Sequence, residues 1–372
     1  MSMSLQVPFV DFKRRYALLK AEIDPAVLEV LASGSYILGE YVETFERQLA
    51  EYLGCPYVLT VANGTDALIM ALKALKISAG DEVIVPANSF IASVGAVVAV
   101  GATPVFCDVA EDLNVDVTKL ETRITKRTKA LFPVHLTGRP VNMTALLEIA
   151  KQHDLAVVED AAQSIGATHQ GQMTGLIGDI GCFSLHPLKN LHVYGDGGII
   201  ATRDEKFYQQ FKTMRNHGLK DRDTCIAWGL NSRLDSLQAA IGSVGMQHIK
   251  AWTERRRQIA SMYRQALQAL VKVPMDAEGD YSVYHNCVVL TKQRDALMKF
   301  LLEQGIESKV HYPIPLHLQP AAVNLGCAKG DFPMVERLAQ EMLSLPVYPE
   351  LEDQQIQRVI RAVQAFFKKG DL

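Results

Sequence analysis

The sequence predicts an α/β protein with a large domain built on a mostly parallel sheet and a smaller α+β domain at its C-terminal end. The chain has 372 residues. This exceeds the length at which a single hydrophobic core usually stops growing. Hydrophobic residues make up 48% of it and charged residues 21%, as is typical of a soluble globular protein. Between residues 58 and 202, short β-rich runs alternate with helical patterns, which favours parallel strands joined by helices.

The large domain is expected within residues 1–250. It opens with a helical segment over residues 16–54, where Phe45, Leu49 and Leu53 recur every four residues and Gly54 is a suitable stop. Strands and helices then follow at VLTVA, TDALIMALKAL, EVIVP, FIASVGAVVAV, TPVFCDV, KALFPVHL, TALLEIAKQHD, LAVVED, GCFSL and GGIIAT. We expect their helices on both faces of one sheet, which is mixed but mostly parallel.

The smaller domain is expected within residues 251–372, together with a connecting helix. Residues 234–270 have the pattern of one or two long helices leading away from the large domain. Beyond them, YHNCVVLT and ESKVHY have the pattern of strands, whereas RDALMKFLLEQ and the stretches 335–343 and 354–367 have that of helices. This mixture indicates a small α+β unit.

Charge and cysteine usage narrow the function classes. The net charge of -3 arises from 38 basic and 41 acidic residues spread along the chain, so we expect neither nucleic acid nor a membrane as partner. The basic run Arg255-Arg256-Arg257 is expected to be a solvated helix face. Six cysteines lie far apart without metal-ligand spacing, which predicts reduced thiols and no metal site. Since no signal peptide or membrane-spanning stretch is recognisable, a cytoplasmic location is expected.

Two charged residues follow predicted strands. Asp160 ends the run LAVVED, and Lys189 comes shortly after GCFSL and before the glycine-rich turn GDGG. Ligand sites of α/β sheets gather at the carboxyl ends of strands. Taken singly, these residues are explained equally well as an acidic loop residue and a solvated lysine. Their combination points to covalent chemistry, because an amine that attacks a cofactor carbonyl has to be partly desolvated.

The segment NGTDAL turns from a predicted strand into a helix through Gly64. The first amides of such a helix are unpaired and attract phosphate. Ordinary helix capping by Asn63 or Thr65 is an alternative explanation. The turn is too short and too poor in glycine for a Walker loop or a dinucleotide fingerprint, which argues against an ATPase and a nicotinamide-dependent dehydrogenase.

Together these segments resemble the nucleotide-sugar aminotransferases of the DegT/StrS type, within the aspartate aminotransferase superfamily (PLP fold type I). The resemblance runs from VPFVDFKRRY and GSYILGEYVETFERQLAEYLG to HYPIPLHLQP and GDFPMVERLAQEMLSLPVYP. It implies a large domain that binds pyridoxal 5'-phosphate and a homodimer with shared active sites. The implied reaction moves an amino group, usually from L-glutamate, to a nucleotide-linked keto-deoxysugar by ping-pong chemistry, with 3-keto favoured over 4-keto. Such reactions serve the biosynthesis of amino sugars, lipopolysaccharide and other polysaccharides.

The resemblance also implies which residues bind the cofactor. Lys189 is the Schiff-base lysine and later carries the proton, and Asp160 faces the pyridine nitrogen, which it keeps protonated. The remaining implied positions are Gln163 near the phenolic oxygen, Phe90 stacked on the ring, Gly64, Thr65 and Ser184 at the phosphate, and Asn231 reaching the site of the neighbouring subunit. The segment of Asn231, GLNSRLDSLQAA, is explained equally well as the capped start of an amphipathic helix.

Four further residues are candidates for contacting the sugar. Tyr312 and His317 of HYPIPLHLQP match a stretch that lies near the sugar nucleotide in the family, although a proline-rich loop explains that stretch as well. His192 and Tyr194 lie between Lys189 and GDGG, where many relatives carry smaller residues. They are expected to shape or contact the sugar, with simple filling of the loop as the alternative.

Two rival functions stay open on this fold. One is a cofactor-dependent sugar dehydratase, in which the family's lysine is commonly a histidine; here Lys189 is present. The other is a regulatory protein that keeps the fold without turnover, which the intact Asp160 and Lys189 disfavour.

Overall fold

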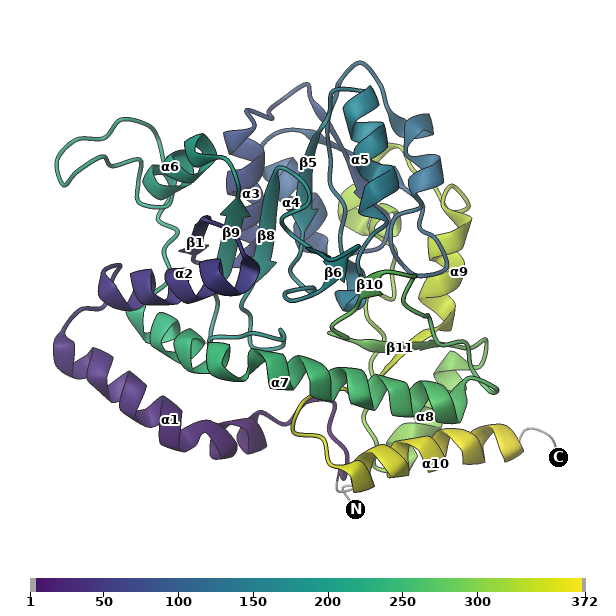
Figure 1. The fold of residues 1–372 in the computed structure, drawn as a ribbon. Helices are drawn as coiled ribbons and strands as arrows, with labels where there is room; N and C mark the ends of the chain where they lie inside the picture. Colours follow the sequence, from purple (N-terminus) through teal and green to yellow (C-terminus); the bar gives the residue numbers. More distant parts are fainter. Residues whose placement is uncertain (1–4, 370–372) are drawn as a thin grey trace.

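The computed structural model describes residues 5–369. Figure 1 shows a central sheet with helices on both faces and a smaller group of helices and strands beside it. The helix α7 (Ser236–Leu267) runs along both parts. Residues 234–270 predict one or two helices, and the structure has one. The α/β fold with a mostly parallel mixed sheet is confirmed.

The large sheet has seven strands in the order β1-β9-β8-β5-β4-β2-β3. Neighbours from β8 to β3 are parallel, whereas β9 is antiparallel to both β1 and β8. The parallel strands therefore end at one common edge. The strands are β1 (Tyr57–Val61), β2 (Glu82–Pro86), β3 (Thr103–Cys107), β4 (Thr128–Leu131), β5 (Ala156–Asp160), β8 (Ile180–Ser184) and β9 (Gly198–Thr202).

Helices cover both faces of this sheet. The sequence predicts one helical segment over 16–54, but the structure divides it, because Gly34 (φ 70°) and Gly39 (φ 77°) adopt left-handed backbone that turns the chain. The helices around the sheet are α2 (Glu40–Leu53), α3 (Gly64–Ala74), α4 (Ile91–Ala99), α5 (Met143–Gln152) and α6 (Glu205–Met214), whereas α1 (Phe12–Ser33) packs on α7.

The two faces of the sheet belong to different cores because successive strand residues point to opposite sides. Ile200 of β9 packs in the cluster that includes α3 and α4. Its neighbours Ile199 and Ala201 pack instead with Phe45 of α2. Strands buried on both faces in this way read as continuous apolar runs, which is how GGIIAT and EVIVP appear in the sequence.

The C-terminal part has its own core, in which Tyr263 and Leu267 of α7 pack with Leu301 and Val363. Val7 joins the same cluster, and the predicted division at residue 250 falls inside the continuous α7. The remaining elements are the hairpin-like strands β6 (Thr168–His169), β7 (Gln172–Met173) and β10 (Asp280–Tyr281), the pair β11 (Cys287–Leu290) and β12 (Met342–Leu345), and the helices α8 (Arg294–Glu303), α9 (Pro333–Glu341) and α10 (Asp353–Lys369).

The expectation of a strand at ESKVHY is wrong. That stretch makes only isolated bridges, such as the one between Lys309 and Ser344 on the edge of β12 that β11 leaves free. The backbone then turns left-handed at Tyr312 (φ 59°), which ends regular pairing.

The contact between α2 and α7 leads to a stability prediction. A methyl group added at Gly242 would lie 2.5 Å from the Phe45 ring, which is fully buried. We expect Gly242→Ala to lower the free energy of unfolding by about 1–3 kcal/mol, since overpacking outweighs the gain in helix propensity. Gly95→Ala in α4, where a methyl group meets nothing within 4 Å, should instead stabilise the protein. Denaturant unfolding measures both, and equal effects of the two changes would contradict the packing argument.

Candidate active site

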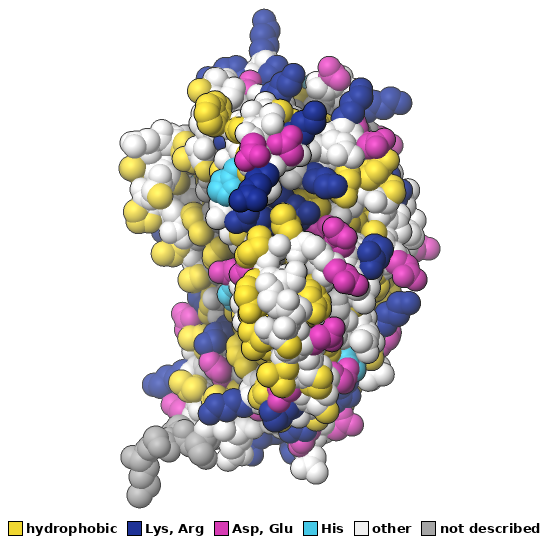
Figure 2. All heavy atoms as spheres, turned by 90° about the vertical axis from the view of Figure 1, so that its left-hand side faces the viewer, with side chains coloured by type: hydrophobic (Ala, Val, Ile, Leu, Met, Phe, Trp, Pro, Cys, Tyr) yellow, Lys and Arg dark blue, Asp and Glu magenta, His cyan; other side chains and the backbone are white. Residues whose placement is uncertain are grey.

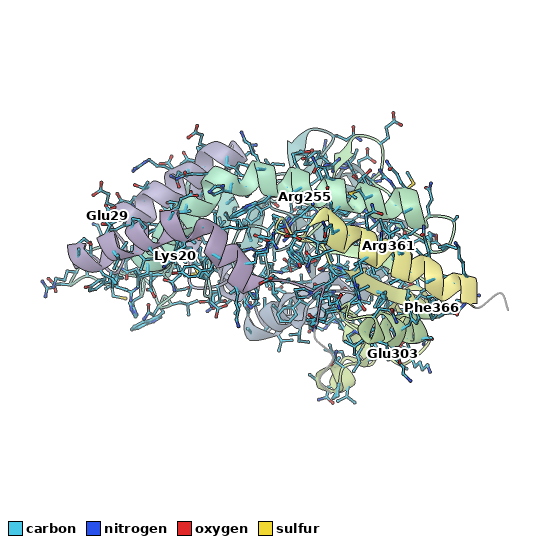
Figure 3. The ribbon with its side chains drawn as sticks, turned by 90° about the horizontal axis from the view of Figure 1, so that it is seen from below. Lys20, Glu29, Arg255, Glu303, Arg361 and Phe366 are labelled. Carbon is cyan, nitrogen blue, oxygen red and sulfur yellow. The ribbon has the colours of Figure 1, made fainter. Side chains whose placement is uncertain are left out.

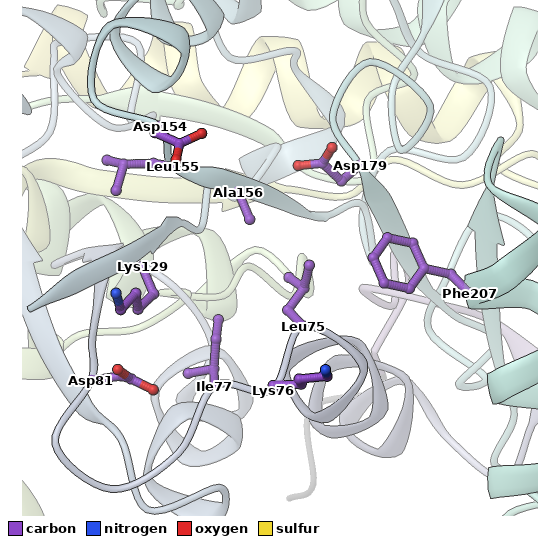
Figure 4. A pocket seen from close by; sticks show the side chains of 10 residues that line it. All are labelled: Leu75, Lys76, Ile77, Asp81, Lys129, Asp154, Leu155, Ala156, Asp179 and Phe207. Atoms are coloured by element: carbon purple, nitrogen blue, oxygen red, sulfur yellow. The ribbon is translucent and has the colours of Figure 1, made fainter.

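A cavity of about 490 Å³ lies at the carboxyl edge of the parallel strands. The turns β1–α3 and β2–α4 and the ends of β5 and β8 form one side of it. Arg256, His285 and Tyr312, from α7 and the C-terminal part, form the other. A second hollow, shown in Figure 4, lies at the opposite edge, where Lys129, Ala156 and other residues surround the starts of β4 and β5. Because ligands of α/β sheets bind beyond the carboxyl ends of strands, the first cavity is the candidate active site.

Lys189 lies at this cavity, in the turn after β8. Its backbone N–H donates to the carbonyl of His186 at 2.8 Å, which fixes the turn. Within residues 5–369 its Nζ makes no hydrogen bond or ion pair, although it lies in the field of Asp160. Burial lowers the pKa of Lys189 to about 8, and the attraction of Asp160 opposes that shift only in part. The side chain is therefore a partly neutral, unpartnered amine at neutral pH.

Asp160, the last residue of β5, is 5% exposed. One carboxylate oxygen accepts a hydrogen bond from Ser93 Oγ at 2.8 Å, and the other accepts the Ala162 N–H at 3.1 Å. Ser93 Oγ lies 2.7 Å from Ser89 Oγ, so a buried chain of hydroxyls runs from the cavity to the carboxylate. Burial raises the pKa of Asp160, whereas Ser93, Ala162 and Lys189 lower it.

Sequence reasoning missed both serines. Ser89 and Ser93 lie one helical turn apart around the start of α4, so they share a face. That spacing is visible in the sequence, but only the sheet order β5-β4-β2 brings the face close to the end of β5.

Gln163 and Tyr312 join the two sides of the cavity. The Gln163 amide donates to the Tyr312 hydroxyl at 2.9 Å, and its oxygen accepts the backbone N–H of Thr137 at 2.7 Å. The Phe90 ring lies 6.2 Å from the Tyr312 ring and is 54% exposed. The predicted residues Gln163, Phe90 and Tyr312 are thus brought to one cavity, and the Tyr312 hydroxyl, which accepts from Gln163, keeps its own proton to donate.

The start of α3 provides the cavity's phosphate-sized corner. Gly64 is the first helical residue, and Asn63 caps only the Asp66 N–H, at 2.8 Å. A methyl group at Gly64 would lie 2.9 Å from Cβ of Ser184, so a larger residue would push the helix from the end of β8. Thr65 lines the cavity beside them. Backbone amides at a helix start and two hydroxyls are a suitable set for an anion.

Four predicted residues do not line this cavity. His192 is 3% exposed and lies between Tyr194 and Trp252, with ring centroids 5.1 and 5.9 Å away. His317 is turned away by the short 3-10 helix Leu316–Leu318 and packs on Phe332 at 4.7 Å. Asn231 is exposed and forms an isolated bridge with Asn216, outside the lining of its own chain's cavity. Their assignments to sugar or cofactor stay predictions.

No cluster of His, Cys, Asp or Glu suited to a metal ion occurs within the described residues. None of the helices there is long and apolar enough to cross a membrane. All six cysteines are free.

Comparison with known proteins identifies the family. The profile of the DegT/DnrJ/EryC1/StrS aminotransferase family matches residues 18–364. The chain belongs to this family. It is 42% identical to a "dTDP-3-amino-3,4,6-trideoxy-alpha-D-glucose transaminase" of Streptomyces venezuelae, over 98% of this chain and 97% of that protein. It is also 42% identical to a "Pleiotropic regulatory protein" of Geobacillus stearothermophilus, over 98% and 99% of the two chains.

The solved structures agree with this membership. The crystal structure of S. venezuelae DesV in complex with a ketimine intermediate superimposes with a TM-score of 0.95 at 42% identity, covering 97% of this chain and 98% of that one. As a DegT-type aminotransferase, this protein is an enzyme that depends on pyridoxal phosphate. The resemblance inferred from the sequence motifs is therefore confirmed.

The cavity of this DegT-type aminotransferase fits pyridoxal phosphate on its own chemistry. An unpartnered amine of lowered pKa is available to an aldehyde, a buried carboxylate is available to a pyridine nitrogen, and the α3 start with Ser184 suits a phosphate. The lack of any hydrogen bond to Lys189 Nζ is the observation that most favours a covalent partner at that atom, because a buried amine otherwise finds an acceptor.

The pKa of Lys189 sets an expected pH dependence. Only the neutral amine attacks an aldehyde, and its fraction rises as the pH increases through the pKa. We expect the rate at which cofactor-free protein takes up pyridoxal phosphate to rise roughly tenfold per pH unit below pH 7 and to level off above about pH 8. Stopped-flow absorbance gives this rate. A rate still rising steeply towards pH 10 would mean that Lys189 keeps an ordinary lysine pKa.

Proposed function

We propose that this enzyme transfers an amino group from L-glutamate to a keto-deoxysugar carried on a nucleotide, with carbon 3 favoured over carbon 4. The observation that carries the proposal is the unpartnered Lys189 amine facing the buried Asp160 in one cavity. The S. venezuelae relative is named as a transaminase of a 3-amino sugar, which supports the sugar class and the position.

Pyridoxal phosphate, when bound, supplies a reversible covalent link to amino groups and an electron sink. Lys189 would hold it, and Lys189 Nζ would then take the proton from the donor carbon and deliver one to the sugar carbon. Asp160 would keep the ring nitrogen protonated, with Ser93 orienting the carboxylate. Gly64, Thr65 and Ser184 would hold the phosphate, and Gln163 and Phe90 would fix the ring.

We also propose a ping-pong order, which the same geometry supports. Within the part of the chain that the structure describes, Lys189 is the one lysine that lines the cavity, so donor and keto sugar would both react beside its Nζ. Each substrate would therefore occupy that position in turn. Parallel lines in double-reciprocal plots at several fixed glutamate concentrations are the expected result, and intersecting lines would contradict it.

A homodimer with shared sites is part of the proposal. Leu18 and Leu28 of α1 are 62% and 63% exposed, and Trp228, in the loop before Asn231, is 97% exposed. Figure 2 shows groups of hydrophobic side chains among charged ones on the face that is turned to the viewer. Such exposed apolar groups favour burial against a second copy, and Asn231 would then reach the neighbouring cofactor site. Light scattering measures the mass.

Two alternatives remain candidates. The name of the G. stearothermophilus relative favours a regulatory role without turnover. A sugar dehydratase would use the same cofactor cavity but eliminate a hydroxyl. Lys189 and Asp160, arranged for proton transfer, favour turnover over the first, and the presence of lysine rather than histidine favours transfer over the second.

The decisive experiment incubates the purified protein, pyridoxal phosphate and L-glutamate with a panel of 3-keto and 4-keto sugar nucleotides. Mass spectrometry distinguishes amination from loss of water. We expect amination, faster with 3-keto sugars. Loss of a hydroxyl would indicate the dehydratase, and amination of keto acids alone would remove the sugar from the proposal.

A further inference from the structure

Arg256 departs from what the run Arg255-Arg256-Arg257 predicts. A solvated helix face is expected for all three. The flanking residues are half-buried and paired with carboxylates, Arg255 with Asp353 at 2.6 Å and Arg257 with Asp276 at 3.5 Å. Arg256 is only 3% exposed and lines the cavity that contains Lys189. For this residue the expectation is wrong, because α7 turns it inward between the large sheet and the C-terminal part.

The Arg256 guanidinium has no carboxylate partner within the described residues. Its Nη1 donates to the backbone carbonyls of Val347 at 2.6 Å, Tyr284 at 3.3 Å and His285 at 3.4 Å. These carbonyls hold the group in place but do not neutralise its charge. Its Nε and Nη2 make no hydrogen bond there, so the edge that binds carboxylates as a fork is left unused.

The groups around Arg256 leave the positive charge uncompensated. Glu350 acts on it, but the two oxygens of Glu350 bind Arg15 at 2.7 and 3.2 Å. Burial and the neighbouring Arg15 lower the pKa of Arg256 to about 9, so the side chain stays charged at neutral pH. His285 is held neutral because burial, and after it the neighbouring charges of Lys189 and Arg256, keep its pKa well below the usual value.

A second donor of this kind, on Asn286, lines the same cavity as Arg256. Asn286 is 4% exposed, lines the cavity, and has no partner for its Nδ2 in the part of the chain that the structure describes. Buried donors of this kind are normally satisfied. Arg256 and Asn286 together therefore make a built site for a small anion beside Lys189.

We infer that Arg256, with Asn286, binds the α-carboxylate of the amino donor, an inference that rests on the proposed function. That carboxylate is bonded to the carbon whose proton Lys189 removes, so its anchor has to lie within the same enclosed cavity. A nucleotide diphosphate is separated from the reacting sugar carbon by the ring, and an enclosed arginine suits it less. The planar guanidinium matches a carboxylate in two parallel hydrogen bonds. A carboxylate on the sugar itself is the other source of the same chemistry.

The test isolates the donor half of the reaction. Cofactor absorbance after mixing the loaded enzyme with L-glutamate alone gives the glutamate concentration at half-maximal rate. Arg256→Gln is expected to raise it about 10- to 100-fold, the loss typical of a hydrogen bond to a charged group. Arg256→Lys should recover part of the affinity, because it keeps the charge without the fork. Inhibition by glutarate, a carboxylate that cannot react, should weaken in parallel.

Arg255→Gln is the matched control. Figure 3 labels this residue on α7, near α10, and its partner Asp353 starts that helix. The glutamate concentration at half-maximal rate of the Arg255→Gln variant should equal that of the unaltered protein. Thermal unfolding and the cofactor spectrum show whether Arg256→Gln folds. If it does not fold, the glutamate concentration at half-maximal rate is compared in Arg256→Lys and Asn286→Ala instead.

Two results would overturn the inference. One is a half-saturating glutamate concentration unchanged within twofold in the folded Arg256 variants. The other is a higher KM for the keto sugar with glutamate unaffected, which would move the site to the sugar. If the unaltered enzyme reacts with glutamate but aminates no sugar, the proposed function fails while the role of Arg256 is still measured.

Discussion

Replacing Lys189 with alanine is expected to reduce kcat for amination by about 10⁴-fold or more. Among the described residues Lys189 is the only lysine that lines the cavity, so the change removes the amine that would both bind the cofactor covalently and move the proton at the reacting carbon. Product formation followed by mass spectrometry gives the rate. The absorbance of the bound cofactor should shift at the same time, because no covalent link to the protein can form.

Lys129→Ala is a suitable control for this loss. Lys129 is exposed at the opposite edge of the sheet, beside the hollow of Figure 4, so its removal should leave the rate unchanged. Added small primary amines should restore part of the activity of Lys189→Ala, since they can carry the missing proton. If Lys189→Ala kept a tenth of the rate or more, the assignment of the lysine would be wrong.

The second large effect is expected for Asp160→Asn. The amide fills the same space and can still accept from Ser93, but it carries no charge to keep the ring nitrogen protonated. We expect kcat to fall roughly 10²–10³-fold, as when a preorganised electrostatic group is removed. Steady-state kinetics at saturating glutamate and sugar measure the change.

Ser93→Ala separates charge from orientation. It leaves the carboxylate in place but removes its 2.8 Å donor, which raises the pKa of Asp160 further. The loss of activity should be smaller than for Asp160→Asn, and the acid limb of the pH–rate profile should move to higher pH. If the thermal unfolding midpoint of Asp160→Asn equals that of the unaltered protein, the lower kcat does not result from unfolding of the variant. Equal rates for Asp160→Asn and the unaltered enzyme would remove Asp160 from the mechanism.

Local patterns were enough for most of the elements, and the family resemblance supplied the candidate cofactor residues. Apolar runs such as EVIVP mark strands because both faces are buried, and the four-residue spacing of Phe45 and Leu49 marks the buried face of α2. Lys189 and Asp160 could be singled out because each follows a strand, and parallel strands end at one edge. Ser93 could not, since its partner lies 67 residues away.

By itself, then, the sequence determined the periodicity of the elements, the family and the residues that follow the strands. Only the tertiary structure decided which polar side chains became buried and what they meet. Arg255, Arg256 and Arg257 are identical in type and adjacent, yet only Arg256 lines the cavity. Arg255 and Arg257 pair with carboxylates, whereas Arg256 donates hydrogen bonds to backbone carbonyls 28, 29 and 91 residues away. Burial of a charge depends on what packs against it, and those contacts come from segments that no local pattern connects.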